Sequence, residues 1–355
     1  MFTSKTTRSL AALAALSLAV GITGCSTGGG SGDDTGSTGK GEPLTFEWGM
    51  ATGSYLATYI ALDRGYFEDE GLKPNVQVFQ SGAPMLAALQ SESLDVGTVG
   101  LATVFALGKG IDIRYFGLEG DASAAEGLVA RAGSGIKSVD DLADGKPIGI
   151  PTGTCAQVSA YYAAKSIGAE YKDLNVVDVV PNLFANSFES KSIDAGFSWS
   201  PFIVDLENDG ATILGWDKDW VPGGGSCPEA QFGRSAFLDE HPEVPQKMLR
   251  ALDRAWKDIR ADRSIAADAL VQRLSVSPET AKAVVDLYVD AQPELADLLD
   301  PANRFSFEGT DGLVAQLKVA SEAFAALGVI DEPLSEERLD EAVDSTAIQA
   351  VIDGK

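Results

Sequence analysis

Residues 45–65 read TFEWGMATGSYLATYIALDRG and predict the first unit of the fold. Thr45–Gly49 is expected to form a strand that enters the Gly/Ser loop Thr52–Tyr55. A helix is predicted at about Ala57–Arg64, and it stops at Gly65. A strand followed by a helix of this length is half of a βαβ unit, which builds parallel sheet.

The same alternation of strands and helices continues through the first 200 or so residues. Further strands are predicted at Asn75–Phe79, Leu94–Gly97, Ile113–Phe116, Glu126–Ala130, Lys146–Ile150, Val176–Val180 and Ala195–Ser198, with helices that include Thr154–Ile167 and Asn182–Ser190. After Phe232 the chain turns almost wholly helical, at Val244–Ile259, Ser264–Leu274 and Ser277–Ala291. Ser277 followed by Pro278 is typical of a helix N-cap.

Two α/β sets with a helical return predict a two-lobed α/β fold in which the first lobe is discontinuous. We expect lobe 1 to contain residues 44–128 and 232–355, and lobe 2 to contain residues 129–231. The chain would cross between the lobes near residues 128–131 and 228–233. Two crossings form a hinge, and a ligand would be held in the cleft between the lobes.

The start of the chain predicts export. Lys5 and Arg8 supply a positive n-region, and Leu10–Ile22 is an apolar run of signal-peptide length. The run ends in Ile-Thr-Gly-Cys, which resembles the lipobox of bacterial lipoproteins. We interpret residues 1–24 as a signal peptide and Cys25 as the lipidated new N-terminus. An ordinary secretory signal with a stray cysteine is the alternative.

A tether is predicted after the lipidated cysteine. Residues 26–42 contain no apolar side chain, so they cannot bury enough surface to offset the entropy of ordering them. We interpret residues 25–43 as the lipidated end and a Gly/Ser-rich linker that lets a folded domain move above a membrane. No second long apolar stretch follows, so this anchor is the only membrane element that we expect.

Charge and composition exclude several functions. The formal net charge is −25, and removal of Lys5 and Arg8 with the signal makes it −27, which argues against nucleic acid because phosphate binding needs clustered Lys and Arg. The acidic residues are dispersed, as on solvated faces. His241 is the only histidine; it begins a predicted helical stretch and is expected to be exposed. No G-x-S-x-G elbow accompanies it, and histidine-rich zinc sites are impossible.

Two cysteines, Cys155 and Cys227, remain once Cys25 is lipidated. They cannot close a tetrahedral metal site by themselves. An even number of cysteines in an oxidising compartment favours a Cys155–Cys227 disulfide, with two separate buried thiols as the alternative.

Several segments resemble the periplasmic binding proteins for taurine, alkanesulfonates and nitrate. FQSGA at 79–83 resembles their FDSGA segment, and LDVGTVG at 94–100 resembles their short strand and glycine turn. Residues 138–154 resemble their K-x-x-DL-x-GK-x-I-A-x-P stretch, and SIDAGFSWSP at 192–201 resembles GDIDGAYVWAP. The likeness extends in order over nearly the whole mature chain, and it implies a type II-like binding-protein fold and a role in import.

The resemblance and the local sequence together indicate an anion site at the turn Pro151–Cys155. The turn joins a strand to a helix, where free backbone N–H groups and the helix dipole favour negative charge. In the sulfonate binders the matching turn places hydroxyl groups on the anion. Thr152, Thr154 and Cys155 are therefore expected to contact the ligand, although Thr154 and Gln157 also fit a capping box.

Other ligand contacts are expected from lobe 1. Gly100 opens a helix whose backbone N–H groups can face the cleft, although Leu101 and Ala102 replace two serines of the taurine proteins. Ser54 and Tyr55 are expected to wall the cleft, with simple packing as the alternative for Tyr55.

Three further residues are expected at or near the cleft. Trp199 would line it or join the core of lobe 2. Glu229 aligns with an acidic residue of the taurine proteins, and a carboxylate there would bind an ammonium group; a surface glutamate is the alternative. Glu126 also aligns with a family glutamate, and we expect a hinge or structural role for it.

The resemblance implies a solute-binding lipoprotein of an ABC importer, whose ligand is a small organic anion or zwitterion. Taurine, another aminosulfonate or an alkanesulfonate is the first choice, and nitrate or a thiamine-pyrimidine precursor is the alternative. A pyrimidine-synthesis-like enzyme on the same fold belongs to a different class, but its cysteine cluster and active-site histidine are absent here. An adhesive surface lipoprotein would show repeats or β-rich modules, and none appear.

The expected partners follow from that function. They are a small-molecule solute, the ABC permease with its ATPase, and the cell membrane. The lipid anchor would attach the protein to the extracytoplasmic face of that membrane. We expect a monomer that binds no nucleic acid, uses no cofactor or metal and has no catalytic residue.

Overall fold

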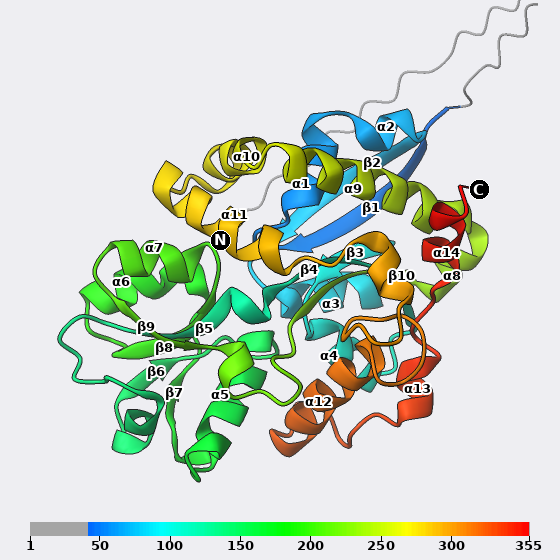
Figure 1. Cartoon of the computed structure of the whole chain (residues 1–355). Helices are drawn as coiled ribbons and strands as arrows, with labels where there is room; N and C mark the ends of the chain where they lie inside the picture. The colour runs from blue at the N-terminus through cyan, green and yellow to red at the C-terminus, as the bar shows by residue number, and fades with distance from the viewer. Residues whose placement is uncertain (1–41, 355) are drawn as a thin grey trace, which may run out of the picture. The chain divides into compact units, whose positions relative to one another are not determined.

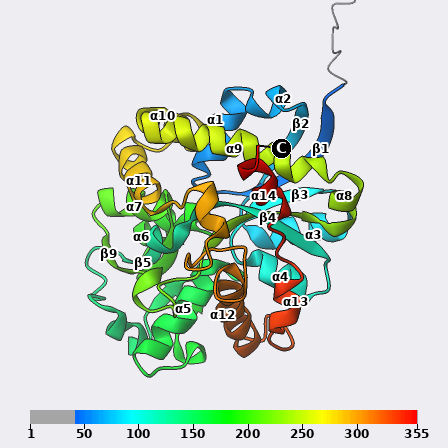
Figure 2. The same ribbon diagram turned by 45° about the vertical axis from the view of Figure 1, so that its right-hand side comes forward.

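The computed structural model describes residues 42–354, and Figures 1 and 2 show this part in two views. The predicted signal peptide, the lipidation of Cys25 and nearly all of the predicted tether lie outside the described residues and stay predictions. Within 42–354, no helix is both long enough and apolar enough to cross a membrane.

Sheet A has five strands in the order β2-β1-β3-β10-β4. Strand β1 pairs in parallel with β2 and β3, whereas β10 runs antiparallel to β3 and β4. The helices α1, α2 and α9 pack together on one side of this sheet, and α3 and α4 pack on the other (Figure 1). These elements are β1 (Leu44–Ala51), α1 (Leu56–Asp63), α2 (Tyr66–Asp69), β2 (Leu72–Phe79), α3 (Gly82–Gln90), β3 (Val96–Val99), α4 (Ala102–Gly108), β4 (Ile113–Asp121), β10 (Pro228–Arg234) and α9 (Glu243–Ala261).

Sheet B also has five strands, in the order β7-β6-β8-β5-β9. Strand β6 is parallel to β7 and β8, and β5 is antiparallel to β8 and β9. Helix α5 packs on β5 and β8, and α7 packs on the same strands with α6 beside it. The elements are β5 (Glu126–Ala130), β6 (Pro147–Gly149), α5 (Cys155–Ser166), β7 (Asn175–Val177), α6 (Phe184–Glu189), β8 (Ala195–Trp199), α7 (Phe202–Asn208) and β9 (Thr212–Trp216).

Two segments join the sheets, and they lie against each other. Residues 122–125, which include the short 3₁₀ helix η1 (Ala122–Ala124), lead from β4 to β5; residues 217–227 lead from β9 to β10. The Ala122 N–H donates to the Cys227 carbonyl at 3.0 Å, and the Cys227 N–H donates to the Ser123 hydroxyl at 3.3 Å. This pair of connections is the structural basis for a hinge, while the division into lobes at the boundaries expected from the sequence stays a prediction.

The C-terminal third of the chain returns to sheet A, and its helices contact helices that pack on both sheets. Helix α11 packs on α7, and α12 packs on both α4 and α5. The predicted N-cap at Ser277 is confirmed, because its hydroxyl accepts the Thr280 N–H at 3.0 Å. The helices are α8 (Ser235–Glu240), α10 (Ser264–Leu274), α11 (Pro278–Ala291), α12 (Leu313–Ala326), α13 (Glu336–Asp340) and α14 (Thr346–Ile352), with further 3₁₀ turns at Val139–Asp144, Tyr171–Asp173, Pro181–Leu183, Asp217–Asp219 and Leu295–Leu299.

Three details differ from the sequence-based expectation. The strand expected at Val176–Val180 ends at Val177, and the helix expected at Asn182–Ser190 is a 3₁₀ turn that continues as α6. Pro181 at the start of that turn lacks the N–H that a strand would need, so pairing ends before it. His241 does not begin a helix: it follows α8, is half-buried, and its ring lies 4.9 Å from that of Phe237.

Candidate ligand-binding site

A cavity lies at the carboxyl ends of β1, β3 and β8, where both sheets contribute residues. Ligands of open α/β sheets bind at this edge. About 440 Å³ of atom-free space lies within the cavity and its open mouth together. Its lining is Ala51, Thr52, Tyr55, Ser81, Gly82, Val99, Gly100, Leu101, Ala102, Ala122, Glu126, Thr154, Cys155, Trp199, Cys227 and Glu229, with no Lys, Arg or His among these residues.

Two helix N-termini form one side of the cavity. Ser81 and Gly82 begin α3, and Thr154 and Cys155 begin α5. The first N–H groups of a helix have no partner within the helix and carry the positive end of its dipole. Ser81 makes no side-chain capping bond, so its hydroxyl can also serve a ligand. This side of the cavity can therefore hold an anion without a basic side chain.

Glycine is required where the site is tightest. A Cβ on Gly82 would lie 2.2 Å from the Ala102 Cβ, and a Cβ on Gly100 would lie 2.5 Å from the Cys155 sulfur. No ordinary Cβ approaches so closely, so a side chain at either position would displace the wall of the cavity.

The Pro151–Cys155 turn is only partly as expected. Thr154 lines the cavity, but its hydroxyl donates to the Pro151 carbonyl at 2.7 Å. Thr152 is exposed and outside the lining, and its N–H donates to Asp178. The capping box is also wrong, since Gln157 accepts from the Gly153 N–H at 2.7 Å and Thr154 makes no capping bond. At this turn the backbone, rather than the hydroxyl groups, is left to face a ligand.

Aromatic side chains close the cavity from both sheets. Tyr55 lines it and packs edge-on against Tyr59, whereas Ser54 is buried beside it and is not part of the lining. Trp199 ends β8 and donates its indole N–H to the Thr52 carbonyl at 2.9 Å. Since Thr52 follows β1 of sheet A, this bond joins the two sheets directly above the cavity.

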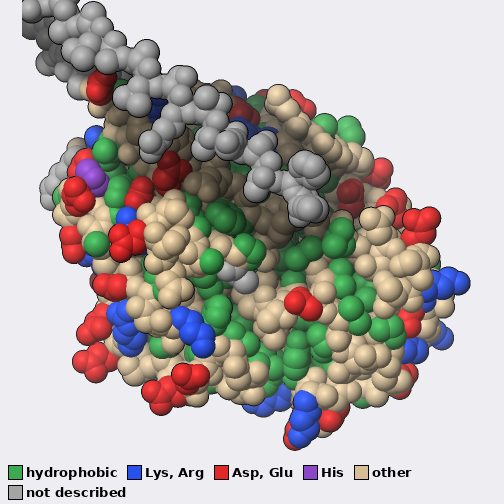
Figure 3. Space-filling view, turned by 180° about the vertical axis from the view of Figure 1, so that it is seen from behind, with side chains coloured by type: hydrophobic (Ala, Val, Ile, Leu, Met, Phe, Trp, Pro, Cys, Tyr) green, Lys and Arg blue, Asp and Glu red, His purple; other side chains and the backbone are tan. Residues whose placement is uncertain are grey.

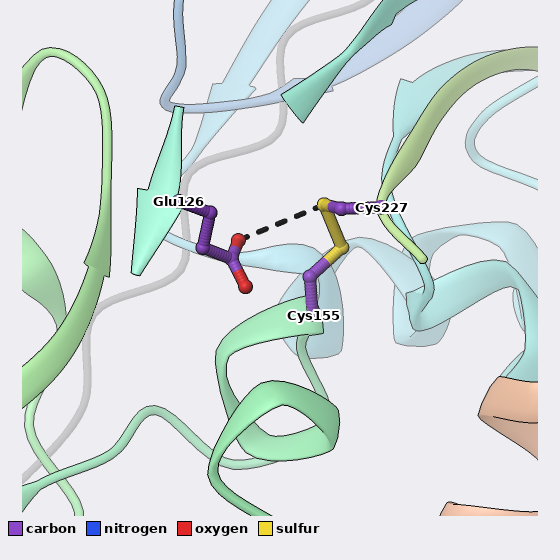
Figure 4. A group of neighbouring side chains, drawn as sticks. All are labelled: Glu126, Cys155 and Cys227. Atoms are coloured by element: carbon purple, nitrogen blue, oxygen red, sulfur yellow. Dashed lines mark hydrogen bonds between the residues drawn. A yellow bond between two sulfur atoms is a disulfide. The ribbon is translucent and has the colours of Figure 1, made fainter. Parts of the chain in front are cut away.

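A disulfide forms part of the cavity wall. Cys155 of α5 is bonded to Cys227, which directly precedes β10, with their Cα atoms 5.5 Å apart (Figure 4). The sulfur atoms and the Glu126 carboxylate lie within 4.8 Å of one another, as in a metal site. Metal binding needs deprotonated thiols, however, and the disulfide consumes both of them. With both thiols oxidised to the disulfide, Glu126, Cys155 and Cys227 form part of the cavity wall and cannot act together as a metal site.

Two buried carboxyl groups, those of Glu126 and Glu229, also line the cavity. Glu229 of β10 is 6% exposed; one oxygen is 3.5 Å from the Tyr288 hydroxyl and the other has no partner. Gly120, its register partner in β4, leaves the space that this carboxyl group occupies. Burial, together with the nearby Glu119 and Asp121, raises the pKa of Glu229 to about 8.

The pKa values of two other acidic groups near the cavity, Glu126 and Asp217, are also raised. Burial raises the pKa of Glu126 well above its usual value, with Asp217 and Glu229 adding to the rise, and burial raises the pKa of Asp217 to about 7. Arg304 lies 3.7 Å from Asp121, and it also donates to the carbonyl of Gly224.

The raised pKa values of these carboxyl groups predict that the stability of the folded protein decreases as the pH rises. A carboxyl group whose folded pKa is raised binds its proton more tightly in the folded state, so stability is lost as the pH rises from the unfolded value through the folded one. For Glu229 this window runs from about 4.5 to about 8. We expect the melting temperature of the ligand-free protein to fall by several degrees across it, and to fall less in Glu229→Gln. Scanning calorimetry from about pH 5 to about pH 8 is the check; a rising melting temperature, or equal slopes in both proteins, would contradict it.

Sequence reasoning placed part of this site and missed the rest. Tyr55, Gly100, Thr154, Trp199 and Glu229 all line the cavity, as does Cys155. It missed the start of α3, although the FQSGA segment that resembles the binding proteins contains both Ser81 and Gly82. It also missed Glu126 and Cys227 as lining residues, although the predicted Cys155–Cys227 disulfide already placed Cys227 beside Cys155.

Residues 53–265, more than half of the chain, match the NMT1/THI5-like family. The chain belongs to that family. It is 29% identical over 257 residues to a Bacillus subtilis (strain 168) protein with the provisional name aliphatic sulfonates-binding protein, covering 67% of this chain and 76% of that protein. It is 24% identical over 283 residues to the taurine-binding periplasmic protein of Escherichia coli (strain K12), covering 77% and 87%.

A solved structure supports the fold of this NMT1/THI5-like chain. The alkanesulfonate-binding protein SsuA from Xanthomonas axonopodis pv. citri, bound to MOPS, matches it with a TM-score of 0.71 over 86% of this chain and 100% of that one. The identity is 19%, so this likeness shows the fold alone. With the two five-stranded sheets, it confirms the two-lobed α/β binding-protein fold expected from the sequence.

The surface of this NMT1/THI5-like protein agrees with the interpretation of its charge. On the face in Figure 3, Asp and Glu side chains are spread around the periphery and do not gather into one patch. Dispersed acidic groups are typical of a solvated surface.

Proposed function

We propose that this protein is the extracytoplasmic solute-binding component of an ABC importer and that it captures a small sulfonate, with an aminosulfonate such as taurine as the first choice. The observation that carries the proposal is the set of groups that line one cavity. The N-termini of α3 and α5 line it together with the carboxyl groups of Glu126 and Glu229, each of which has an oxygen without a hydrogen-bond partner. A small molecule that carries both an anion and an ammonium group complements both kinds of group.

The related proteins support the choice of ligand class. One is named for aliphatic sulfonates and another for taurine. Nitrate has no N–H donor, so it would leave the partnerless oxygens of both carboxyl groups without a hydrogen bond, and a buried polar group without a partner is costly. A thiamine-pyrimidine precursor lacks the anion that the helix N-termini would bind. The aminosulfonate is thus favoured over both alternatives.

Binding without turnover is part of the proposal. Nucleophilic catalysis would need an activated thiol or hydroxyl beside a base. Both cavity cysteines are in a disulfide, and no histidine lines the cavity. We assign the carboxyl groups to binding and propose no catalytic residue.

The remaining partners follow from the import role. We propose a lipid anchor at Cys25, a monomer in solution, and delivery of the solute to a permease with its ATPase. Release would require the sheets to part at the cavity, which breaks the bond between Trp199 and Thr52 and the one between Asn182 and Gln80, at 2.9 and 2.7 Å.

Calorimetric titration with taurine, ethanesulfonate and nitrate tests the function. We expect one saturable site with taurine as the tightest of the three. Mass spectrometry after prolonged incubation should recover taurine unchanged. Steady chemical conversion of the ligand, or no binding of any sulfonate, would contradict the proposal.

A further inference from the structure

Three side chains of the kinds that bind metals meet in the wall of the cavity. One potential ligand atom from each of Cys155, Cys227 and Glu126 lies within 4.8 Å of the other two. Figure 4 shows the Glu126 carboxyl group directed toward the two sulfur atoms. The residues come from three separate segments, the starts of α5 and β5 and the residue before β10, and all three are buried. While the disulfide is intact it consumes both thiols, so the cluster can take a metal only after reduction.

The spacing of these atoms suits a tetrahedral zinc ion. A carboxylate oxygen and a thiolate sulfur bound to one Zn²⁺ are about 3.6 Å apart, and two such sulfur atoms are about 3.8 Å apart. Oε2 of Glu126 already lies 3.6 Å from the Cys227 sulfur. The Cα atoms of the two cysteines are 5.5 Å apart, so rotation about their Cα–Cβ bonds can bring free sulfur atoms to the second spacing. Coordination therefore requires no movement of the backbone.

The surroundings favour the ionised form of a released thiol. Cys155 is the first residue of α5, a helix of 12 residues whose positive dipole end favours negative charge. The Leu101 N–H also donates to the Cys155 sulfur at 3.5 Å. The thiolate is the form that binds a metal. Glu126 is equally available, because its Oε1 has no hydrogen-bond partner.

We propose that reduction of the disulfide converts Cys155, Cys227 and Glu126 into a binding site for a thiophilic divalent cation such as Zn²⁺. The two cysteines cannot close a tetrahedral site by themselves, and Glu126 supplies the third protein ligand. The fourth position faces the cavity that all three residues line, which gives the ion an entry path and leaves a place for water. Because the metal alone is the ligand, this inference does not depend on the proposed function.

The chemistry needs a reductant, and a dithiol is the class that exchanges with accessible disulfides. One of its thiolates attacks a cysteine sulfur, the Cys155–Cys227 bond breaks, and the second thiol then resolves the mixed disulfide. The protein gains two electrons and two protons as two thiols, and the dithiol becomes a cyclic disulfide. Zn²⁺ then replaces the proton of each thiol, and both protons pass to water. If the Glu126 carboxyl group is protonated, its proton is released as well.

Metal titration of the full-length protein tests the proposal. The protein is reduced with a phosphine, which becomes its oxide with an oxygen from water, and is titrated with Co²⁺ and then Zn²⁺. The proteins are the wild type, Glu126→Gln, Glu207→Gln and Cys155→Ala/Cys227→Ala. Glu207 is exposed on α7 outside the cavity, so its variant controls for the loss of one charge. The double variant retains Cys25, so it controls for that thiol.

The reduced wild type should bind one Co²⁺ per chain with a sulfur-to-metal charge-transfer band that Zn²⁺ abolishes. The oxidised wild type and the double variant should show no such band. Zn²⁺ should raise the melting temperature of the reduced wild type and leave that of the oxidised protein unchanged. Glu126→Gln should bind at least about tenfold more weakly than the wild type, and Glu207→Gln should stay within about twofold of it.

Absence of the charge-transfer band in the reduced wild type would overturn the proposal. So would a Glu126→Gln protein that binds as tightly as Glu207→Gln, because the thiols would then be capturing the metal without the carboxylate. That comparison remains decisive even if reduction loosens the fold, since an unfolded chain would bind through its cysteines and would be insensitive to Glu126.

Discussion

Replacing Glu229 with glutamine is expected to weaken taurine binding by about 10–100-fold, on the order of 1.5–3 kcal/mol. The carboxyl group is buried, and its partnerless oxygen would pair with the ligand's ammonium group. A desolvated charge pair loses far more from removal of one partner than an exposed pair does. Calorimetric titration of both proteins measures the change.

Ethanesulfonate is the matched control for this variant, because it lacks only the amine. Its affinity should be unchanged or higher in Glu229→Gln, since the neutral amide no longer needs a cation. If the wild type bound both ligands equally well, Glu229 would have no part in the recognition of an ammonium group, and a plain anion would become the better candidate ligand.

Removing the disulfide should cost about 2–5 kcal/mol of stability, or roughly 5–10 °C in melting temperature. Cys155 and Cys227 are 72 residues apart, so the bond restricts a long loop in the unfolded chain. It also fastens the N-terminus of α5 to the start of β10. We therefore expect the double variant Cys155→Ala/Cys227→Ala to bind taurine more weakly as well, because the two ends of the cavity lose their fixed separation.

Chemical reduction distinguishes loss of the bond from loss of the sulfur atoms. A thiol reductant should lower the melting temperature of the wild type by a similar amount and leave the double variant unchanged. A wild type that melts at the same temperature with and without reductant, while peptide mapping shows free thiols, would contradict a stabilising role.

The fold was largely predictable because its local signals agree with one another. Alternating strands and helices at 45–116 and 126–198 predict two α/β sets, and Glu126–Ala130 and Ser264–Leu274 match the observed elements. Neither sheet order nor pairing follows from such local patterns: β10 lies between β3 and β4 in sheet A although more than 100 residues separate it from β4. Long-range pairing of this kind depends on tertiary packing.

The site was less predictable, because contact with a ligand depends on where each side chain points. Thr152 and Thr154 belong to the same turn, yet one is exposed and the other donates to a backbone carbonyl. Glu126 was expected to have a hinge or structural role, and only the fold shows that its carboxyl group also lies against the disulfide. Residue type and spacing identified the Pro151–Cys155 turn, but only the three-dimensional packing identifies which groups within it are left for a ligand.

A crystal structure of the protein with taurine is the most direct test of the two-ended cavity. We predict that the sulfonate lies against the N-termini of α3 and α5, near Ser81 and Cys155, and that the ammonium group lies between Glu126 and Glu229. Taurine bound in the reverse orientation, or outside this cavity, would contradict the account.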